Sequence, residues 1–235
     1  MFRAMPRLAS LVALLAVLAV SVTVGGCTEM RAAPADLGKL LTERAADTVE
    51  SFRADKNLSQ FADQIRTARA VAILPHVYKA GFIVGAEGGN GVLIAKTSPG
   101  QWGAPAFYTL ASGSVGFQAG LQDVEMLLII RNEKALQAIL KHQGKFGADG
   151  GITVGVFGAG VEASTTTAVG ADVLAFVRSR VGLYGGISLE GAALVRRKDV
   201  NEAAYGPGAT PQAIVIENRF QYPPADRLRQ VLAKQ

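Results

Sequence analysis

The chain has 235 residues, 49% of them hydrophobic, and a formal net charge of +5. This length is enough for one substantial domain with its own core. So modest a positive charge does not by itself indicate a nucleic-acid-binding protein. The only cysteine is Cys27 and the only histidines are His76 and His142. We therefore predict no internal disulfide, no metal site and no cofactor, and a domain that is held together by packing.

The N-terminus has the pattern of a secretory signal. Residues 1–7 carry two arginines and no acid, residues 11–20 are all apolar, and small residues lead into Cys27. Ten apolar residues are too few for a membrane-spanning helix, which needs about 20. Because the small residues end at a cysteine, the segment resembles the lipobox of bacterial lipoproteins, in which that thiol is lipidated. The alternative is an ordinary signal with a chance cysteine.

Three parts are expected: a lipoprotein signal peptide (residues 1–26), a tether (27–35) and a single domain (36–235). Removal of the signal takes away two arginines, so the net charge falls to +3. This mildly basic charge fits attraction to an anionic membrane surface. Thr28, rather than Asp, follows Cys27. By resemblance to lipoprotein sorting in bacteria with two membranes, this points to the outer membrane, facing the periplasm.

A long amphipathic helix is predicted over residues 37–53, with Asp36 as its cap. Its apolar face suits either a bilayer surface or the sheet of its own domain. Docking on the sheet is the commoner outcome, and the charged face of this helix carries as much acid as base. For the bilayer alternative, the predicted lipid contacts are Leu37, Lys39, Leu40, Leu41, Arg44, Phe52, Arg53 and Lys56. A second helix is predicted at 58–68.

From residue 70 the apolar pattern changes to a period of two, which is typical of strands. The first predicted strand, 70–74, is closed by Pro75, and the strands 81–87 and 91–96 are predicted to form a hairpin about the turn 88–90. Further strands are expected at 107–110, 114–121 and 124–131. The last is apolar on both faces, which indicates a central strand covered on both sides. Asn132 is the predicted cap of a helix over 133–141.

The rest of the chain predicts strands at 150–157, 161–168, 171–178, 184–195 and 213–216. A helical turn at 199–204 and a helix at 225–233 complete the pattern. Of the 27 glycines, 22 lie between residues 81 and 191. Glycine among strand formers is typical of bulges and of close backbone approach in a curved sheet. The predicted fold class is α+β: a curved, largely antiparallel, glycine-rich sheet, barrel- or sandwich-like, with packed helices and an N-terminal amphipathic helix.

No motif in the sequence indicates catalysis, so a non-enzymatic protein is expected. Three carboxylates, Glu87, Glu162 and Glu190, lie in glycine-rich strands. A buried carboxylate needs a partner, and the candidates are Lys79, Arg178 and Arg180. One interpretation is an anion or metal pocket. The favoured alternative is internal ion pairing or exposure on the outer face of the sheet.

Five segments stand out between residues 63 and 216: KAGFIVGAEGGNGVLI, WGAPAFYTLASGSVGFQAG, NEKALQAIL, GADGGITVGVFGAGVEA and SRVGLYGGISLEGAAL. In these segments and in their order, the chain resembles the SYLF domain family. The resemblance implies a lipid-binding domain, with phosphoinositide binding in eukaryotic members and actin binding in yeast members. In bacteria the family occurs as exported lipoproteins, in agreement with Cys27. The first helix, however, lacks the dense basic cluster that inositol phosphates would favour.

The expected function is therefore that of a membrane-anchored envelope lipoprotein. Its partners would be anionic phospholipid headgroups and the acyl chains on Cys27, with no nucleic acid. One alternative is a structural or partner-binding envelope module for which lipid contact is incidental. Another is a barrel that encloses an apolar ligand.

Overall fold

The computed structural model describes residues 32–58, 60–81, 84–115, 120–142, 144–147, 151–158, 170–181, 189 and 191–234. The signal peptide, Cys27, the strand predicted at 161–168, Glu162 and Glu190 lie outside the described residues. The statements made about them above remain predictions.

Eight strands form one sheet in the order β6-β7-β5-β1-β2-β4-β8, with β3 paired to β2 off this path. Their bounds are β1 (Ala70–Gly81), β2 (Val84–Ser98), β3 (Gln101–Trp102), β4 (Ala106–Val115), β5 (Gly120–Ile130), β6 (Val154–Gly158), β7 (Val173–Val181) and β8 (Ala193–Arg196). Among the described strands, β6 and β7 are the one pair that runs parallel, so the largely antiparallel prediction is confirmed. Within the described residues β6 and β8 do not pair, so the sheet is open rather than a closed barrel.

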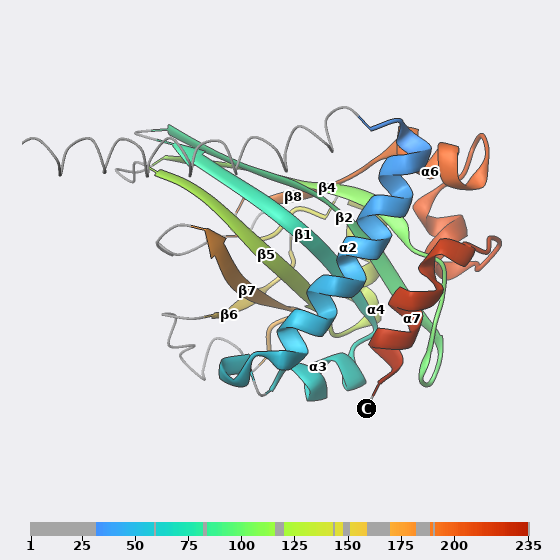
Figure 1. Ribbon diagram of the computed structural model, residues 1–235, viewed down its shortest axis with the longest axis horizontal. Helices are drawn as coiled ribbons and strands as arrows, with labels where there is room; N and C mark the ends of the chain where they lie inside the picture. The colour runs from blue at the N-terminus through green and yellow to red at the C-terminus, as the bar shows by residue number, and fades with distance from the viewer. Residues whose placement is uncertain are drawn as a thin grey trace, which may run out of the picture.

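Helices pack on this sheet, which confirms the α+β class. They are α2 (Pro34–Ala54), α3 (Phe61–Thr67), α4 (Glu133–His142), α6 (Lys198–Tyr205) and α7 (Asp226–Ala233). Figure 1 shows α2 crossing one face of the sheet, with α6 beside its first turns and α3 at its far end. Docking on the sheet is thus the alternative that the structure adopts.

Asp36 does not cap α2, contrary to the prediction. The cap position is Ala33, and Pro34 is the first helical residue. Proline suits this position because its missing N–H is one that a helix leaves unpaired and its fixed φ is already helical. Asp36 lies in the first turn instead, where its negative charge faces the positive end of the helix dipole.

Two predictions about the first strands are wrong, for connected reasons. The first strand does not stop at Pro75 but continues to Gly81, with a bulge that shifts its register between Ile73 and Tyr78. Proline is tolerated in a strand at such a bulge because the local ladder is already interrupted. The predicted turn at 88–90 is instead the middle of the single strand β2, which pairs there with β4.

The central strand and its following helix match the prediction. Strand β5 lies between β1 and β7, and its residues from Met126 to Ile130 are fully buried. The side-chain oxygen of Asn132 accepts a hydrogen bond from the backbone N–H of Ala135 at 2.8 Å, so it caps α4. In α4, Leu136 and Ile139 are buried as expected.

Towards the C-terminus, α6 and α7 confirm the predicted helices, but the expected strand at 213–216 is a short π-helical turn, η3 (Gln212–Ile216). The hydroxyl oxygen of Thr210 accepts a hydrogen bond from the N–H of Ala213 at 3.2 Å. Thr210 therefore caps the turn. A short apolar run fits a buried helical turn as well as a strand.

Two further boundaries moved. The strand predicted at 114–121 is divided between the end of β4 and the start of β5. The single-turn helix η1 (Lys56–Leu58) precedes α3, so the second predicted helix begins later than expected. A further 3-10 turn, η4 (Pro223–Ala225), leads into α7.

Candidate functional site

The structure divides the predicted lipid contacts of α2 into buried and accessible residues. Leu37, Leu41 and Phe52 are at most 2% exposed and belong to the core beneath α2. Their assignment as lipid contacts stays a prediction that requires α2 to leave the sheet. The others are half-buried or exposed in the docked position: Lys39, Leu40, Arg44, Arg53 and Lys56. Arg53 donates a hydrogen bond to the carbonyl oxygen of Lys234 at 2.7 Å, and burial lowers its pKa.

The acidic side of α2 is partly occupied by α7. The Arg227 guanidinium lies 3.2 Å from Glu43, 2.7 Å from Asp47 and 2.8 Å from Glu50. The hydrogen bond with Asp47 contributes most to raising the pKa of Arg227 above its ordinary value. These contacts join the first described helix to the last.

Beneath α2 lies a buried ionic cluster centred on Glu125 of β5, whose side chain is 3% exposed. Arg178 contacts its carboxylate at 2.6 Å and Arg180 at 3.1 Å, both from β7. Thr48 and Ser51 of α2 donate hydrogen bonds to the same carboxylate at 3.3 and 3.2 Å. Arg178 and Arg180 were predicted as ion-pair partners of a carboxylate, but Glu125 was not predicted. A lone acid within the apolar run VEMLLII is the signal that could have indicated it.

Two neighbouring carboxylates are also buried and paired. Asp123 contacts His76 Nδ1 at 3.0 Å, and Glu87 contacts Lys79 Nζ at 2.9 Å with its side chain only 2% exposed. For Glu87 the prediction of internal ion pairing with Lys79 is therefore confirmed. One of its carboxylate oxygens, Oε2, has no hydrogen-bond partner among the described residues.

In the part of the chain that the structure describes, no three His, Cys, Asp or Glu side chains lie close enough to hold a metal ion. None of the helices described there combines the length and the apolar character that crossing a membrane would require.

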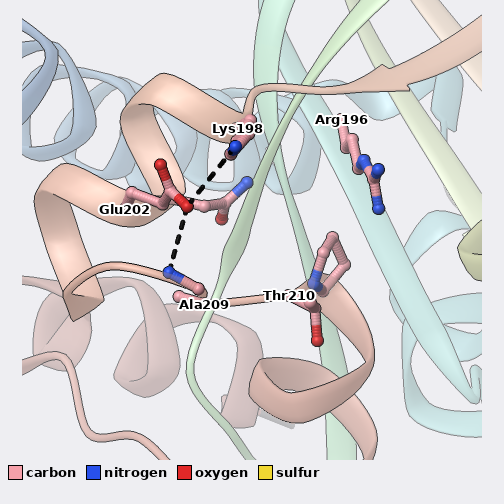
Figure 2. A pocket seen from close by; sticks show the side chains of 8 residues that line it. Arg196, Lys198, Glu202, Ala209 and Thr210 are labelled. Atoms are coloured by element: carbon pink, nitrogen blue, oxygen red, sulfur yellow. Dashed lines mark hydrogen bonds and ion pairs between the residues drawn. The ribbon is translucent and has the colours of Figure 1, made fainter.

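A small polar pocket lies between the end of β8, the start of α6 and the segment that follows α6 (Figure 2). Its volume is about 200 Å³. Lys198 and Glu202 lie on one side of the pocket and Arg196 on the other, with Ala209 and Thr210 along its lower edge in the view of Figure 2. We call it the α6 pocket.

Side chains around α6 fix the shape of this pocket. Asn201 is 1% exposed; its amide donates to the carbonyl of Phe107 at 3.0 Å and accepts from the N–H of Phe107 at 2.9 Å. It thereby joins α6 to the start of β4. Arg197 donates to both carboxylate oxygens of Asp199, and this hydrogen bonding is the main reason that the pKa of Asp199 lies below its ordinary value.

The two remaining basic side chains of the α6 pocket are accessible. Arg196 is exposed, and its side chain forms no hydrogen bond or ion pair with any residue that the structure describes. Lys198 is 74% exposed and lies 3.9 Å from Glu202, a distance at which the attraction is weak. Glu202 also accepts a hydrogen bond from the N–H of Gly208 at 3.0 Å. No residue of this pocket was predicted as a site. In the sequence, Arg196 and Arg197 form a short basic pair that matches no known binding motif.

Comparisons with known proteins identify the family. A family model described as Ysc84, Las17-binding protein actin regulator, matches residues 111–235. The SH3 domain-containing YSC84-like protein 1 of Xenopus laevis is 36% identical over 143 residues, which cover 60% of this chain and 42% of that protein. Protein YSC84 of Saccharomyces cerevisiae is 29% identical over 201 residues, which cover 81% of this chain and 42% of that protein.

This chain therefore matches only about two fifths of the length of these relatives. The family model, in contrast, spans more than half of the chain, and the match confirms the resemblance to the SYLF domain drawn from the glycine-rich segments. The chain belongs to the Ysc84 family, whose SYLF domain it shares.

Proposed function

We propose that this chain is a non-enzymatic envelope lipoprotein, held to the membrane by acyl chains on Cys27, whose SYLF domain binds anionic phospholipid. The observation that carries the proposal is the position of two exposed basic side chains, Lys39 of α2 and Lys198 of α6. They belong to the first turns of α2 and to the helix beside them, at the end of the domain that continues towards Cys27.

Chain length limits how far this end can be from an acylated cysteine. Ala32, the first described residue, follows Cys27 by five residues. Five residues span at most about 18 Å when fully extended. With Cys27 anchored in a bilayer, the start of α2 and the neighbouring α6 must remain near the lipid headgroups, whereas the far end of α2 lies about 30 Å away along the helix axis.

The anchor makes a weak headgroup affinity sufficient. A tethered domain faces the headgroups at a high effective concentration, and each Lys or Arg close to an anionic surface contributes about 1 kcal/mol. Lys39 and Lys198 are exposed near the start of α2, and Arg196 is exposed at the end of β8. Docking of the apolar face of α2 on the sheet leaves these cations accessible to lipid, with Lys39 only 3.8 Å from Asp36 and Lys198 3.9 Å from Glu202 in weak surface ion pairs.

The lipid-binding part of the proposal is tested without the anchor. The mature domain carrying Cys27→Ala is sedimented with phosphatidylglycerol vesicles and, as the control, with phosphatidylcholine vesicles. We expect binding to phosphatidylglycerol only, weakening as salt is added because the attraction is screened. Equal recovery with both lipids, or no binding even at low salt, would remove the claim.

The anchoring part is tested in cells. Labelled palmitate should be incorporated into the wild-type protein and not into the Cys27→Ala variant, and fractionation should place the wild type in the outer membrane. Two or more acyl chains make release from a bilayer negligible. An unlabelled wild-type protein in the soluble fraction would contradict the anchor.

The family description favours a second candidate function, binding of a protein partner, because it names Las17 binding and actin regulation. Those activities belong to relatives more than twice as long as the matched region. For this chain the candidate is an envelope module with its own protein partner. A stoichiometric partner that remains bound to the purified protein in detergent would support it.

A further inference from the structure

We infer that the α6 pocket binds one phosphodiester group, held between Arg196 and Lys198. This inference rests on the proposed function in one respect, namely that the phosphodiester belongs to a lipid headgroup. The same chemistry could be supplied by a soluble phosphodiester, and the experiment below separates the two sources.

The donors of the pocket are suited to phosphate oxygens. The guanidinium of Arg196 presents paired N–H groups, and no hydrogen bond or ion pair joins it to a side chain that the structure describes. This distinguishes it from its neighbour Arg197, which is bonded to Asp199 and to Asn90. The Thr210 hydroxyl accepts a hydrogen bond from Ala213, so its own proton is available to donate.

The charge of the pocket favours a single negative charge. Arg196 and Lys198 contribute two positive charges and Glu202 one negative charge, while Arg197 and Asp199 cancel. Glu202 is held in place by the N–H of Gly208, whose φ of 80° is a conformation that glycine adopts without strain. The net charge of +1 matches a phosphodiester better than a phosphomonoester, which carries nearly two negative charges.

The pocket also lies where a tethered domain would meet headgroups. A β-carbon at Gly38, in the second turn of α2, would be 3.4 Å from Val200 of α6. Lys198 is two residues before Val200 and begins the same helix. Figure 1 shows α6 beside the start of α2, so the pocket belongs to the end of the domain that is closest to Cys27 along the chain.

The test compares three variants of the mature domain on phosphatidylglycerol vesicles. Arg196→Ala combined with Lys198→Ala should weaken binding about 30-fold, since each cation near an anionic surface contributes about fivefold. The matched control, Arg66→Ala with Lys134→Ala, removes the same charge from exposed residues of α3 and α4 and should change binding by less than about threefold. If the two double variants lost vesicle affinity equally, the binding would depend on the overall charge of the domain and not on the pocket, and the inference would be overturned.

The third variant should move binding in the opposite direction. Glu202→Gln keeps an acceptor for the N–H of Gly208 and removes the negative charge. We expect about fivefold tighter binding. Because this is a gain, it cannot result from misfolding. No gain, with folding confirmed by an unchanged melting temperature, would contradict the charge argument.

Glycerophosphoglycerol, the soluble headgroup of phosphatidylglycerol, separates the sources. NMR of the wild type should show shifts at the amides of Gly208 and Thr210, which line the pocket, and these shifts should be absent in the double variant. Shifts together with pocket-dependent vesicle binding assign the group to a lipid. Shifts from a domain that binds no vesicles assign it to a soluble phosphodiester, and then the proposed function fails while the pocket stands. No shifts and no pocket-dependent vesicle binding overturn the pocket itself.

Discussion

The carbonyl oxygen of His76 occupies the space that a β-carbon on residue 89 would need: an added methyl group at Gly89 would lie 2.0 Å from it. The bulge in β1 around Pro75 and His76 brings this backbone against β2. Gly91 meets the carbonyl of Ile73 in the same way, at 2.2 Å. These glycines allow close approach of two backbones rather than forming a turn.

Gly89→Ala should therefore destabilise the domain by at least about 3 kcal/mol, at the upper end of what overpacking costs, because the obstacle is backbone and cannot rotate away. Gly113→Ala in β4 is the control, since nothing lies within 4 Å of its added methyl group. It should be neutral or slightly stabilising. Urea unfolding of both variants measures the difference, and equal midpoints would contradict the packing argument.

Removal of the central carboxylate in Glu125→Ala should cost about 3–5 kcal/mol, because Arg178 would be left half-buried without its partner. Glu217→Ala is the comparison. Glu217 pairs with Arg219, whose side chain is 68% exposed, and loss of such a surface pair should cost no more than about 1 kcal/mol. The unfolding free energies should differ by several-fold; similar values would mean that the cluster beneath α2 adds no net stability.

The stability of the β6–β7 pair should depend on pH through Asp172. Burial alone would raise its pKa, but hydrogen bonds from Asn132 and Thr153 outweigh burial, so the pKa falls below its ordinary value of 3.8. The ionised carboxylate therefore stabilises the folded state above pH 3.8, and this contribution is lost as the pH falls through the folded pKa. Asp172→Asn should lower the unfolding free energy at neutral pH and converge with the wild type in acid. A difference in unfolding free energy that persists in strong acid would mean that the substitution acts through packing and not through the charge of Asp172.

Hydrogen exchange should show whether α2 remains on the sheet at a membrane. Val49 and Phe52, like the apolar residues near the start of α2, are fully buried, and helices so placed open only with the global free energy of unfolding. We expect the α2 amides to keep their protection when phosphatidylglycerol vesicles are added. Faster exchange confined to α2, with β5 unchanged, would instead support contact of Leu37, Leu41 and Phe52 with lipid.

The elements that could be predicted from sequence are those whose signal is local. Asn132 caps α4 through its own side chain, and the continuous apolar run of β5 indicates burial on both faces wherever its neighbours lie. The glycines of β2 gave the wrong answer because a glycine in a hairpin turn and one facing a bulged neighbour look alike until the pairing of β1 and β2 is known.

Sites assembled from distant segments could not be predicted in the same way. Glu125 and its partners come from α2, β5 and β7, so their pairing depends on the strand order. The α6 pocket combines Arg196 with Thr210, which no motif connects. The amphipathic pattern of α2 does show one apolar face, but that pattern is the same for a helix on a sheet and a helix on a bilayer.

The ion pairs that Arg227 forms with Glu43, Asp47 and Glu50 have a consequence for how the chain folds after synthesis. The two helices lie near opposite ends of the chain, so the ion pairs of α2 with Arg227 cannot form before the last helix has been made available. If the chain crossed a membrane through a channel with its N-terminus first, α2 would lack these contacts until α7 had also crossed.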